Sequence, residues 1–345
     1  MSATTKFFAV AAAGVLVAAA VILYKTERPP MDTVQRGFRG LGMQEVYNPR
    51  MLAATASLNQ VPASLPQSEG GPPAGTVYKN VQVLNNVSVG EFTRLMVSIT
   101  NWVSPTQGCA YCHNTDDMAE ESHYTKIVAR RMIQMVQHVN ADWKPHVAET
   151  GVTCFTCHRG NPVPRMVWFN GSAGPGGGPV EQAGGFAQMP AGKNHPAPAA
   201  GDTSLPFDPY TAFLERNADV RVNSATALPS GDRASIKQTE WTYALMMSMS
   251  QALGVNCTYC HNTRSFFDWD QSTPQRATAY YGIRMVRDIN DEYMHSLQTV
   301  FPPARLGPHG DVAKVNCGTC HQGVYKPLFG ASLVKDFPEL QHSTR

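Results

Sequence analysis

The sequence has no cysteine outside one repeated motif. All eight cysteines fall into a single pattern, Cys-x-x-Cys-His, which occurs four times. None is left to build the disulfide framework of a small secreted domain, and none near the N-terminus can carry a lipid. A lipid-modified cysteine is therefore excluded as a membrane anchor. The four copies begin at Cys109, Cys154, Cys257 and Cys317.

Charged residues are also sparse and are not clustered. Lysine, arginine, aspartate and glutamate make up 16% of the chain, the formal net charge is +2, and no run of lysines and arginines occurs. Binding to a phosphate backbone depends on clustered positive charge. The net charge itself argues neither for nor against a nucleic-acid partner, and we expect none; any charged docking patch must be local.

Strand-like alternation of apolar and polar residues is weak throughout the sequence. Helical spacing of apolar residues is clear in four places, at 92–99, 127–139, 241–253 and 283–289. The expected fold class is therefore mainly α, with irregular stretches between the helices because the chain has 25 prolines and 28 glycines.

Each Cys-x-x-Cys-His copy predicts one covalently bound haem c. Its two thiols can each add to a vinyl group of the porphyrin, and the adjacent histidine can ligate the iron. Zinc ribbons and redox disulfides also use paired cysteines, but neither requires a histidine after all four pairs. The sequence thus predicts four haem c groups, attached through Cys109, Cys112, Cys154, Cys157, Cys257, Cys260, Cys317 and Cys320, with His113, His158, His261 and His321 as iron ligands.

A long apolar run lies near the N-terminus. Residues 7–24 are almost all Ala, Val, Leu, Ile and Phe, with Lys6 before the run and Lys25 after it. At about 1.5 Å per residue this run spans roughly 27 Å, which suits a hydrocarbon core of about 30 Å. A cleaved signal peptide is the alternative, supported by the small residues at 18–20. We expect a retained membrane anchor over 1–30, with the remainder in the periplasm, because haem c is attached outside the cytoplasm.

The rest of the sequence contains a duplicated unit. Leu95–Asn101 parallels Leu245–Gln251, and Met135–Asn140 parallels Met285–Asn290, each ahead of an attachment motif. The expected architecture is a multihaem cytochrome c with two pseudo-symmetric halves, each ordered helix, haem site, helix, haem site. Its expected parts are an extended N-terminal segment (31–75), a first haem pair (76–165), a Gly/Pro-rich connection (166–235), a second haem pair (236–325) and a C-terminal tail (326–345).

The second axial ligand of each iron decides whether a haem transfers electrons or binds a small molecule. Met96 and Met246 occupy equivalent positions ahead of the first and third sites, and this register favours ligation over a role in packing alone. Met132 precedes the second site and faces inward on its predicted helix, with Met135 one turn away as the alternative. The fourth site differs, because the residue equivalent to Met132 is Gly282, which has no side chain.

The fourth iron must therefore take its second ligand from elsewhere. We favour His146, because Pro145 is expected to end the preceding helix and to free the next side chain. His295 is the next candidate. The histidines outside the motifs are His123, His138, His146, His195, His295, His309 and His342.

Three features of the sequence are typical of one known family. They are the segment Gln35-Arg36-Gly37-Phe38-Arg39-Gly40, the two duplicated haem pairs, and the four motifs with their spacings. From Gln35 to Gly323 they resemble the tetrahaem cytochrome subunit of purple-bacterial photosynthetic reaction centres. Many members of that family carry a lipid-modified N-terminal cysteine, which this sequence lacks; a membrane helix would tether it equally well. The resemblance implies Met96, Met132 and Met246 as axial partners of His113, His158 and His261, and His146 as the partner of His321.

The resemblance also implies a function. The protein would be an electron-transfer subunit and not an enzyme, with a near-linear row of haems leading to the bacteriochlorophyll pair held by the L and M subunits. Its donor would be a soluble cytochrome or iron–sulfur protein, its location the inner photosynthetic membrane with the haem domain in the periplasm, and light-harvesting antenna helices would lie within reach. A quinol-oxidising or other multihaem oxidoreductase and a self-contained electron-storage cytochrome are the alternatives.

Overall fold

The computed structural model describes residues 2–25, 32–35, 44–47, 49–68, 70–170, 208–220 and 236–341. Within these residues the fold is mainly α, which confirms the expected class, and the strands form a single two-stranded sheet. Its strands, β1 (Asp32–Gln35) and β2 (Gln44–Tyr47), are antiparallel, with Asp32 opposite Tyr47.

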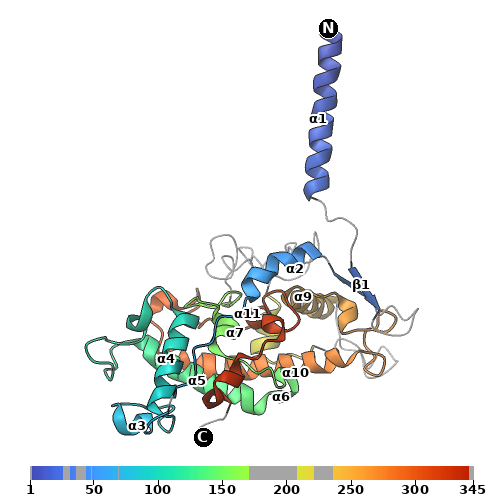
Figure 1. The fold of residues 1–345 in the computed structure, drawn as a ribbon. Coiled ribbons are helices and arrows are strands. Elements are labelled where there is room, and N and C mark those ends of the chain that lie inside the picture. The colour runs from blue at the N-terminus through green and yellow to red at the C-terminus, as the bar shows by residue number, and fades with distance from the viewer. Residues whose placement is uncertain are drawn as a thin grey trace.

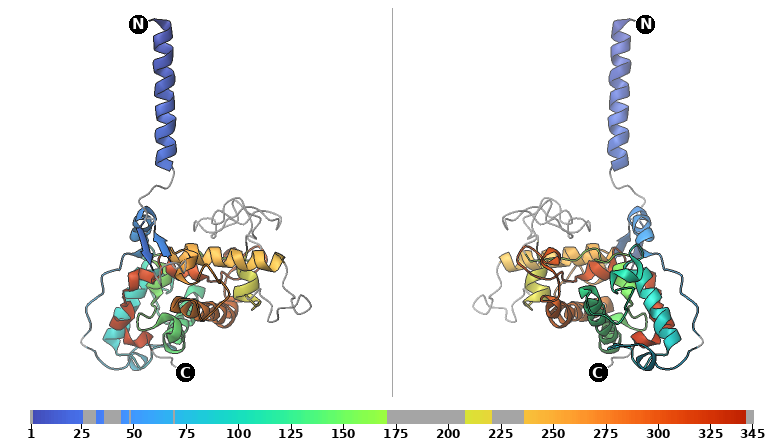
Figure 2. Two further views of the ribbon diagram at one scale, coloured as in Figure 1. Left: turned by 90° about the vertical axis from the view of Figure 1, so that its right-hand side faces the viewer. Right: turned by 90° about the vertical axis from the view of Figure 1, so that its left-hand side faces the viewer.

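Helix α1 (Ala3–Lys25) stands clear of the rest of the protein (Figure 1, Figure 2). Its segment Thr4–Tyr24 has a mean hydropathy of 2.5, and none of its most apolar part is buried. Apolar side chains exposed around a whole helix are stable in a nonpolar medium and costly in water. Among the described residues, α1 is the one helix long and apolar enough to cross a membrane.

The four helices expected from apolar spacing are all present. They are α4 (Val89–Val103), α5 (Tyr124–Asp142), α9 (Ile236–Leu253) and α10 (Pro274–Asp288). Local sequence explains where they begin. The Ser88 hydroxyl accepts a hydrogen bond from the Glu91 N–H at the start of α4, and Pro274 occupies the first turn of α10, where its missing N–H is harmless.

Short helical elements connect these helices and carry the attachment motifs. The short α-helices are α2 (Pro49–Ala56), α3 (Ala74–Val77), α6 (Lys144–Val147), α7 (Cys154–His158) and α11 (Cys317–His321). Single turns of 3-10 or π type are η1 (Ser57–Asn59), η2 (Gly108–Tyr111), η5 (Thr211–Glu215), η7 (Cys257–Tyr259), η8 (Ile289–Met294), η9 (His295–Leu297), η10 (Pro303–Arg305), η11 (Pro327–Gly330), η12 (Leu333–Asp336) and η13 (Pro338–Leu340).

Two of the segments expected to lack structure are partly ordered into elements. The N-terminal segment 31–75 contains the β1–β2 sheet, α2, η1 and the start of α3, so its extended part is confined to the described residues 60–68 and 70–72. In the connection 166–235, residues 171–207 and 221–235 lie outside the described residues. Of the remainder, Trp168 pairs with Lys314 in an isolated β-bridge, and Tyr210 and Phe213 are buried.

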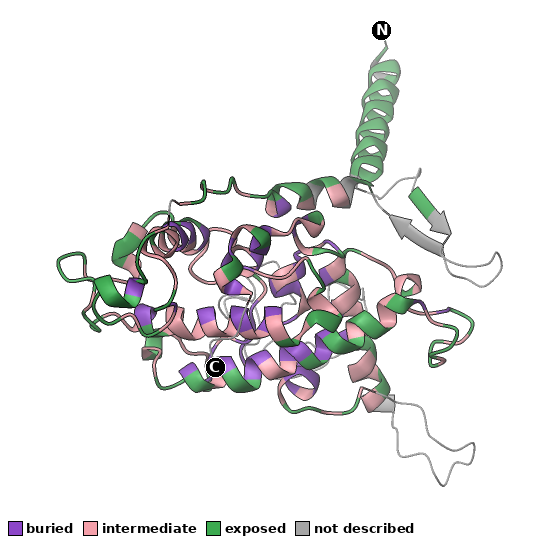
Figure 3. Ribbon diagram, turned by 60° about the horizontal axis from the view of Figure 1, so that its bottom comes forward, coloured by how far each residue is buried: buried purple, intermediate pink, exposed green. Residues whose placement is uncertain are grey.

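The C-terminal residues 326–341, expected to form a tail, pack onto the first half of the duplication. Val334, Phe337 and Leu340 are buried in one cluster with Leu95 and Trp102 of α4. In Figure 2 the red C-terminal segment lies beside the cyan helix of the first half. Figure 3 shows the buried residues gathered on the inward faces of the long helices, while α1 is exposed along its length. The C-terminal end of the chain therefore belongs to the core of the first half.

Candidate haem-attachment sites

The second and fourth attachment motifs have the same local structure, which bears out the duplication at the level of the backbone. Helices α7 and α11 each begin with a capping box, made by Thr153 with Thr156 in one and by Asn316 with Thr319 in the other. Each ends at a residue in the left-handed region directly after the histidine, namely Arg159 (φ 49°) and Gln322 (φ 48°). The shared motif Val-x-Cys-x-Thr-Cys-His therefore specifies one rigid turn twice.

Each motif histidine is oriented by a hydrogen bond from its Nδ1 atom to a backbone carbonyl. A carbonyl oxygen only accepts, so Nδ1 carries the proton and Nε2 keeps a free lone pair. This is the tautomer that a metal-binding histidine needs, with the ring held by its other nitrogen. In the first and third sites the accepting carbonyl belongs to the fifth residue after the histidine, and in the second and fourth sites to the third residue after it. The four hydrogen bonds run from His113 to Met118 (3.1 Å), from His261 to Phe266 (2.8 Å), from His158 to Asn161 (2.9 Å) and from His321 to Val324 (3.0 Å).

Burial keeps these imidazoles neutral. Desolvation lowers the pKa of His113, His158 and His261 below the usual value of 6.5. It lowers the pKa of His321 to about 4, with further contributions from His146 and from the positive charge of Arg159. Because the charged imidazolium cannot bind a metal, low pKa values leave all four rings ready to ligate at neutral pH.

His146 lies opposite His321. The two ring centres are 6.1 Å apart, although His146 belongs to α6 in the first half and His321 to α11 in the second. Two imidazoles that bind one metal ion from opposite sides, with metal–nitrogen bonds of about 2 Å, have ring centres roughly 6 Å apart. The His146 Nδ1 donates to the carbonyl of Thr278 at 2.9 Å, which again leaves Nε2 free. The pair therefore fits a six-coordinate iron.

The other described histidines outside the motifs are less suited to this role. Both ring nitrogens of His138 contact carboxylates, at 2.6 Å from Asp142 and 2.6 Å from Asp288. The Nε2 of His295 lies 3.3 Å from Glu215. His309 is exposed, and His123 bonds the neighbouring Ser122 through Nδ1. His195 and His342 lie outside the described residues.

The three candidate methionines lie where the sequence predicts, on α4, α5 and α9. Met96, Met132 and Met246 are each half-buried against the hydrophobic cluster of their own region. Helix α4 contacts η2 at the first site, and α5 contacts α7 at the second. Helix α9 ends at a left-handed Gly254 (φ 64°) and leads within three residues into the third site. Ligation by these methionines stays a prediction.

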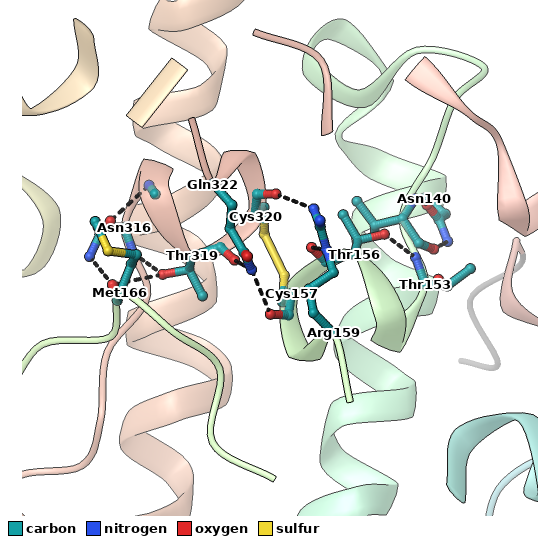
Figure 4. Close-up of a disulfide and its surroundings, with 12 residues drawn as sticks. Asn140, Thr153, Thr156, Cys157, Arg159, Met166, Asn316, Thr319, Cys320 and Gln322 are labelled. Atoms are coloured by element: carbon teal, nitrogen blue, oxygen red, sulfur yellow. Dashed lines mark hydrogen bonds between the residues drawn. A yellow bond between two sulfur atoms is a disulfide. The ribbon is translucent and has the colours of Figure 1, made fainter. Parts of the chain in front are cut away.

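The second and fourth sites touch each other, a contact that the sequence analysis did not foresee. Cys157 and Cys320 form a disulfide with their Cα atoms 4.5 Å apart. Figure 4 shows reciprocal hydrogen bonds around it: Arg159 donates to the carbonyl of Cys320 (3.0 Å), and Gln322 donates to that of Cys157 (3.2 Å). Each cysteine sulfur forms only one covalent bond besides the bond to its Cβ atom. Cys157 and Cys320 can therefore form either this disulfide or one thioether bond each to a porphyrin, but not both.

Metal binding by the cysteines themselves is disfavoured. Burial raises the pKa of the Cys154 thiol to about 12 and that of the Cys317 thiol to about 11, which favours the protonated thiols in the absence of a metal ion. Among the described residues, no group of three or more His, Cys, Asp or Glu side chains is placed to hold a metal ion. The motifs therefore fit attachment to a porphyrin better than a zinc site.

Comparison with known proteins gives a consistent result. Residues 27–341 match the family model described as the photosynthetic reaction centre cytochrome C subunit. The chain is 54% identical to the photosynthetic reaction center cytochrome c subunit of Rubrivivax gelatinosus over 329 residues, which covers 95% of this chain and 88% of the relative. It is 51% identical to the same subunit of Thermochromatium tepidum, covering 94% and 79%, and 40% identical to that of Roseobacter denitrificans, covering 95% and 90%. With anchored histidines at four motifs and a match over nearly its whole length, the chain belongs to the family of photosynthetic reaction-centre cytochrome c subunits, which carry covalently bound haem c and transfer electrons in photosynthesis.

Proposed function

We propose that this chain carries four haem c groups and passes electrons from a soluble periplasmic donor to the photo-oxidised bacteriochlorophyll pair of the L and M subunits. The observation that carries the number four is the uniform Nδ1 anchoring of the four motif histidines. When bound, each haem supplies an iron that changes its oxidation state by one electron. The eight motif cysteines hold the porphyrins, and the iron ligands are His113 with Met96, His158 with Met132, His261 with Met246 and His321 with His146.

This ligand set favours electron transfer over catalysis. A second protein ligand at every iron leaves no open position for a substrate or for a small molecule. The 6.1 Å separation of the His146 and His321 rings supports such closure at the fourth site. Thioether ligands raise the potential of an iron relative to two imidazoles, so we expect three sites of higher potential and one, the fourth, of lower potential.

Element contacts support a spatial order of the sites. Helices α7 and α11 contact each other, α4 packs on α7, and α9 packs on α11. This arrangement supports the order first, second, fourth, third along the molecule. Strand β2, which follows the anchor in the sequence, contacts η7 at the third site. We therefore propose that the third site faces the membrane and the L and M subunits, while the first site faces a soluble cytochrome or iron–sulfur protein.

The anchoring of the subunit follows from α1. We propose that α1 is retained in the inner photosynthetic membrane and that the haem domain lies in the periplasm. A retained helix would also meet light-harvesting antenna helices. Lys25 at its end and the exposed ring of Tyr24 are residue types common at a membrane interface.

Flash absorbance tests the function. Membranes that contain the protein are excited in the bacteriochlorophyll band while the haem α-band is followed. Haem oxidation within microseconds is expected, because the subunit would be the direct reductant of the pair. With the haems reduced beforehand, an absence of light-driven oxidation would contradict the proposal and favour a quinol-linked cytochrome.

A further inference from the structure

Gly282 of α10 lies against the ring of His146. A Cβ atom built on Gly282 would lie 2.6 Å from His146 Cε1, 2.8 Å from Nδ1 and 3.2 Å from Nε2. Separations below 3.0 Å are not tolerated between such atoms, so any other residue requires the ring to move. The backbone of Gly282 is helical and needs no special conformation. Since glycine weakens a helix interior, its presence here is explained by the space that the ring takes.

The ring of His146 has little freedom to withdraw. Its Nδ1 is bonded to the carbonyl of Thr278, one turn before Gly282 on the same helix. Its other side faces His321, with the ring centres 6.1 Å apart. The ring therefore fills the space between α10 and α11, and it reaches that space from α6, which packs against α10.

The duplication allows Gly282 to be compared with the equivalent residue of the first half. Gly282 stands at the position that Met132 occupies in the first half, when Met135 is aligned with Met285. A methionine on the helix and an imidazole brought from the other half would occupy the same space. The two arrangements exclude each other.

We propose that Gly282 is the positioning residue that selects histidine over methionine as the second ligand of the fourth iron. The inference rests on the proposed function, in which His146 and His321 bind that iron. It explains how one duplicated framework provides a site of different potential: the loss of one side chain admits a ligand from the opposite half. Gly282 itself touches no iron and acts only through the position of His146.

Two substitutions in the intact subunit, purified with its reaction centre, test the proposal. Electron paramagnetic resonance and the methionine-to-iron charge-transfer absorption report the ligands of each iron, and a redox titration reports the four midpoints. Gly282→Ala should abolish the bis-histidine signature, which belongs to one haem in four, and leave the other three unchanged. Gly282→Met should replace that signature with a fourth methionine signature and move the lowest midpoint up among the other three.

Ala277→Met is the matched control, because it adds a methionine to an exposed position of the same helix. It should change neither the ligand signatures nor the midpoints. If Gly282→Ala keeps the bis-histidine signature and the lowest midpoint, the inference is wrong. If the Gly282→Met variant does not accumulate, the Gly282→Ala variant still tests the inference, because it adds only one carbon atom, at the position that meets the His146 ring.

The wild-type spectrum separates this inference from the proposed function. A wild-type protein without any bis-histidine haem would overturn the ligand assignment itself. A wild-type protein with one such haem, which His146→Ala removes and Gly282→Ala does not, would overturn only the role of Gly282.

Discussion

Phe337 provides a test of whether the C-terminal segment stabilises the first half of the duplication. The side chain is fully buried, at 0% exposure. Its ring meets Trp102 edge to face with centres 4.8 Å apart, and the Arg94 guanidinium lies 4.2 Å from the ring centre. Both partners belong to α4, the helix that carries Met96.

Phe337→Ala would remove these contacts and leave a cavity in the core. Truncation of a buried phenylalanine costs about 3 to 5 kcal/mol, and an aromatic pair adds to the area term. We expect the free energy of unfolding to fall by about 4 kcal/mol. Denaturant titration of the purified chain, followed by circular dichroism, measures this change. Because α4 loosens, the haem proposed at the first site should respond spectroscopically before the one proposed at the third.

Phe329→Ala is the matched control, because Phe329 lies in the same segment but is 57% exposed. Its expected cost is below about 1 kcal/mol. Equal denaturation midpoints for the two variants would refute the idea that the C-terminal segment is part of the first core. A selective response of the third haem would refute the assignment of this core to the first half.

Substitutions in two ion pairs test the electrostatics of the fold. Lys314 is fully buried and its ammonium group pairs with Asp311, so Asp311→Asn would leave an uncompensated buried charge and should cost about 3 to 5 kcal/mol in thermal or denaturant unfolding. The double variant Asp311→Asn with Lys314→Met should recover part of that loss, and failure to recover any would contradict this explanation. Hydrogen bonds from Arg130 hold the pKa of Glu121 at about 2, below the usual 4.5, so its stabilisation is present above pH 4.5 and is lost as the pH falls towards 2. The carboxyl is 41% exposed, so Glu121→Gln should cost less than about 1 kcal/mol at neutral pH. If the free energy of unfolding falls equally steeply between pH 4.5 and 2 in the wild-type protein and in Glu121→Gln, the pairing with Arg130 is contradicted.

Local sequence predicted the parts of the fold that depend on local interactions. The stripes at 92–99 and 127–139 gave helices because their apolar faces pack inward, as α4 and α5 do. Pro145 indicated a helix end for a sound reason: α5 stops at Asp142, and Pro145 takes the first turn of the next helix. The glycine at 282 pointed to a ligand from elsewhere, and the structure brings His146 to that place.

Contacts between distant segments could not be read from the sequence. The approach of Cys157 to Cys320 brings together residues 163 positions apart, and no local pattern marks it. The apolar residues Val334, Phe337 and Leu340, spaced three positions apart, were a weak signal that 326–341 is buried, but nothing in them indicates α4 as the partner. The bridge from His138 to Asp288 crosses the two halves in the same way.

The burial of Phe337 and Leu340 in the first half has a consequence for the order of assembly. If the residues after α1 are exported in the order of synthesis, the motifs at Cys109 and Cys154 emerge long before the last residues of the chain. The core beside those motifs lacks Phe337 and Leu340 until export is complete. If the domain is exported as proposed, Phe337 and Leu340 would cover the core beside the first two attachment motifs last.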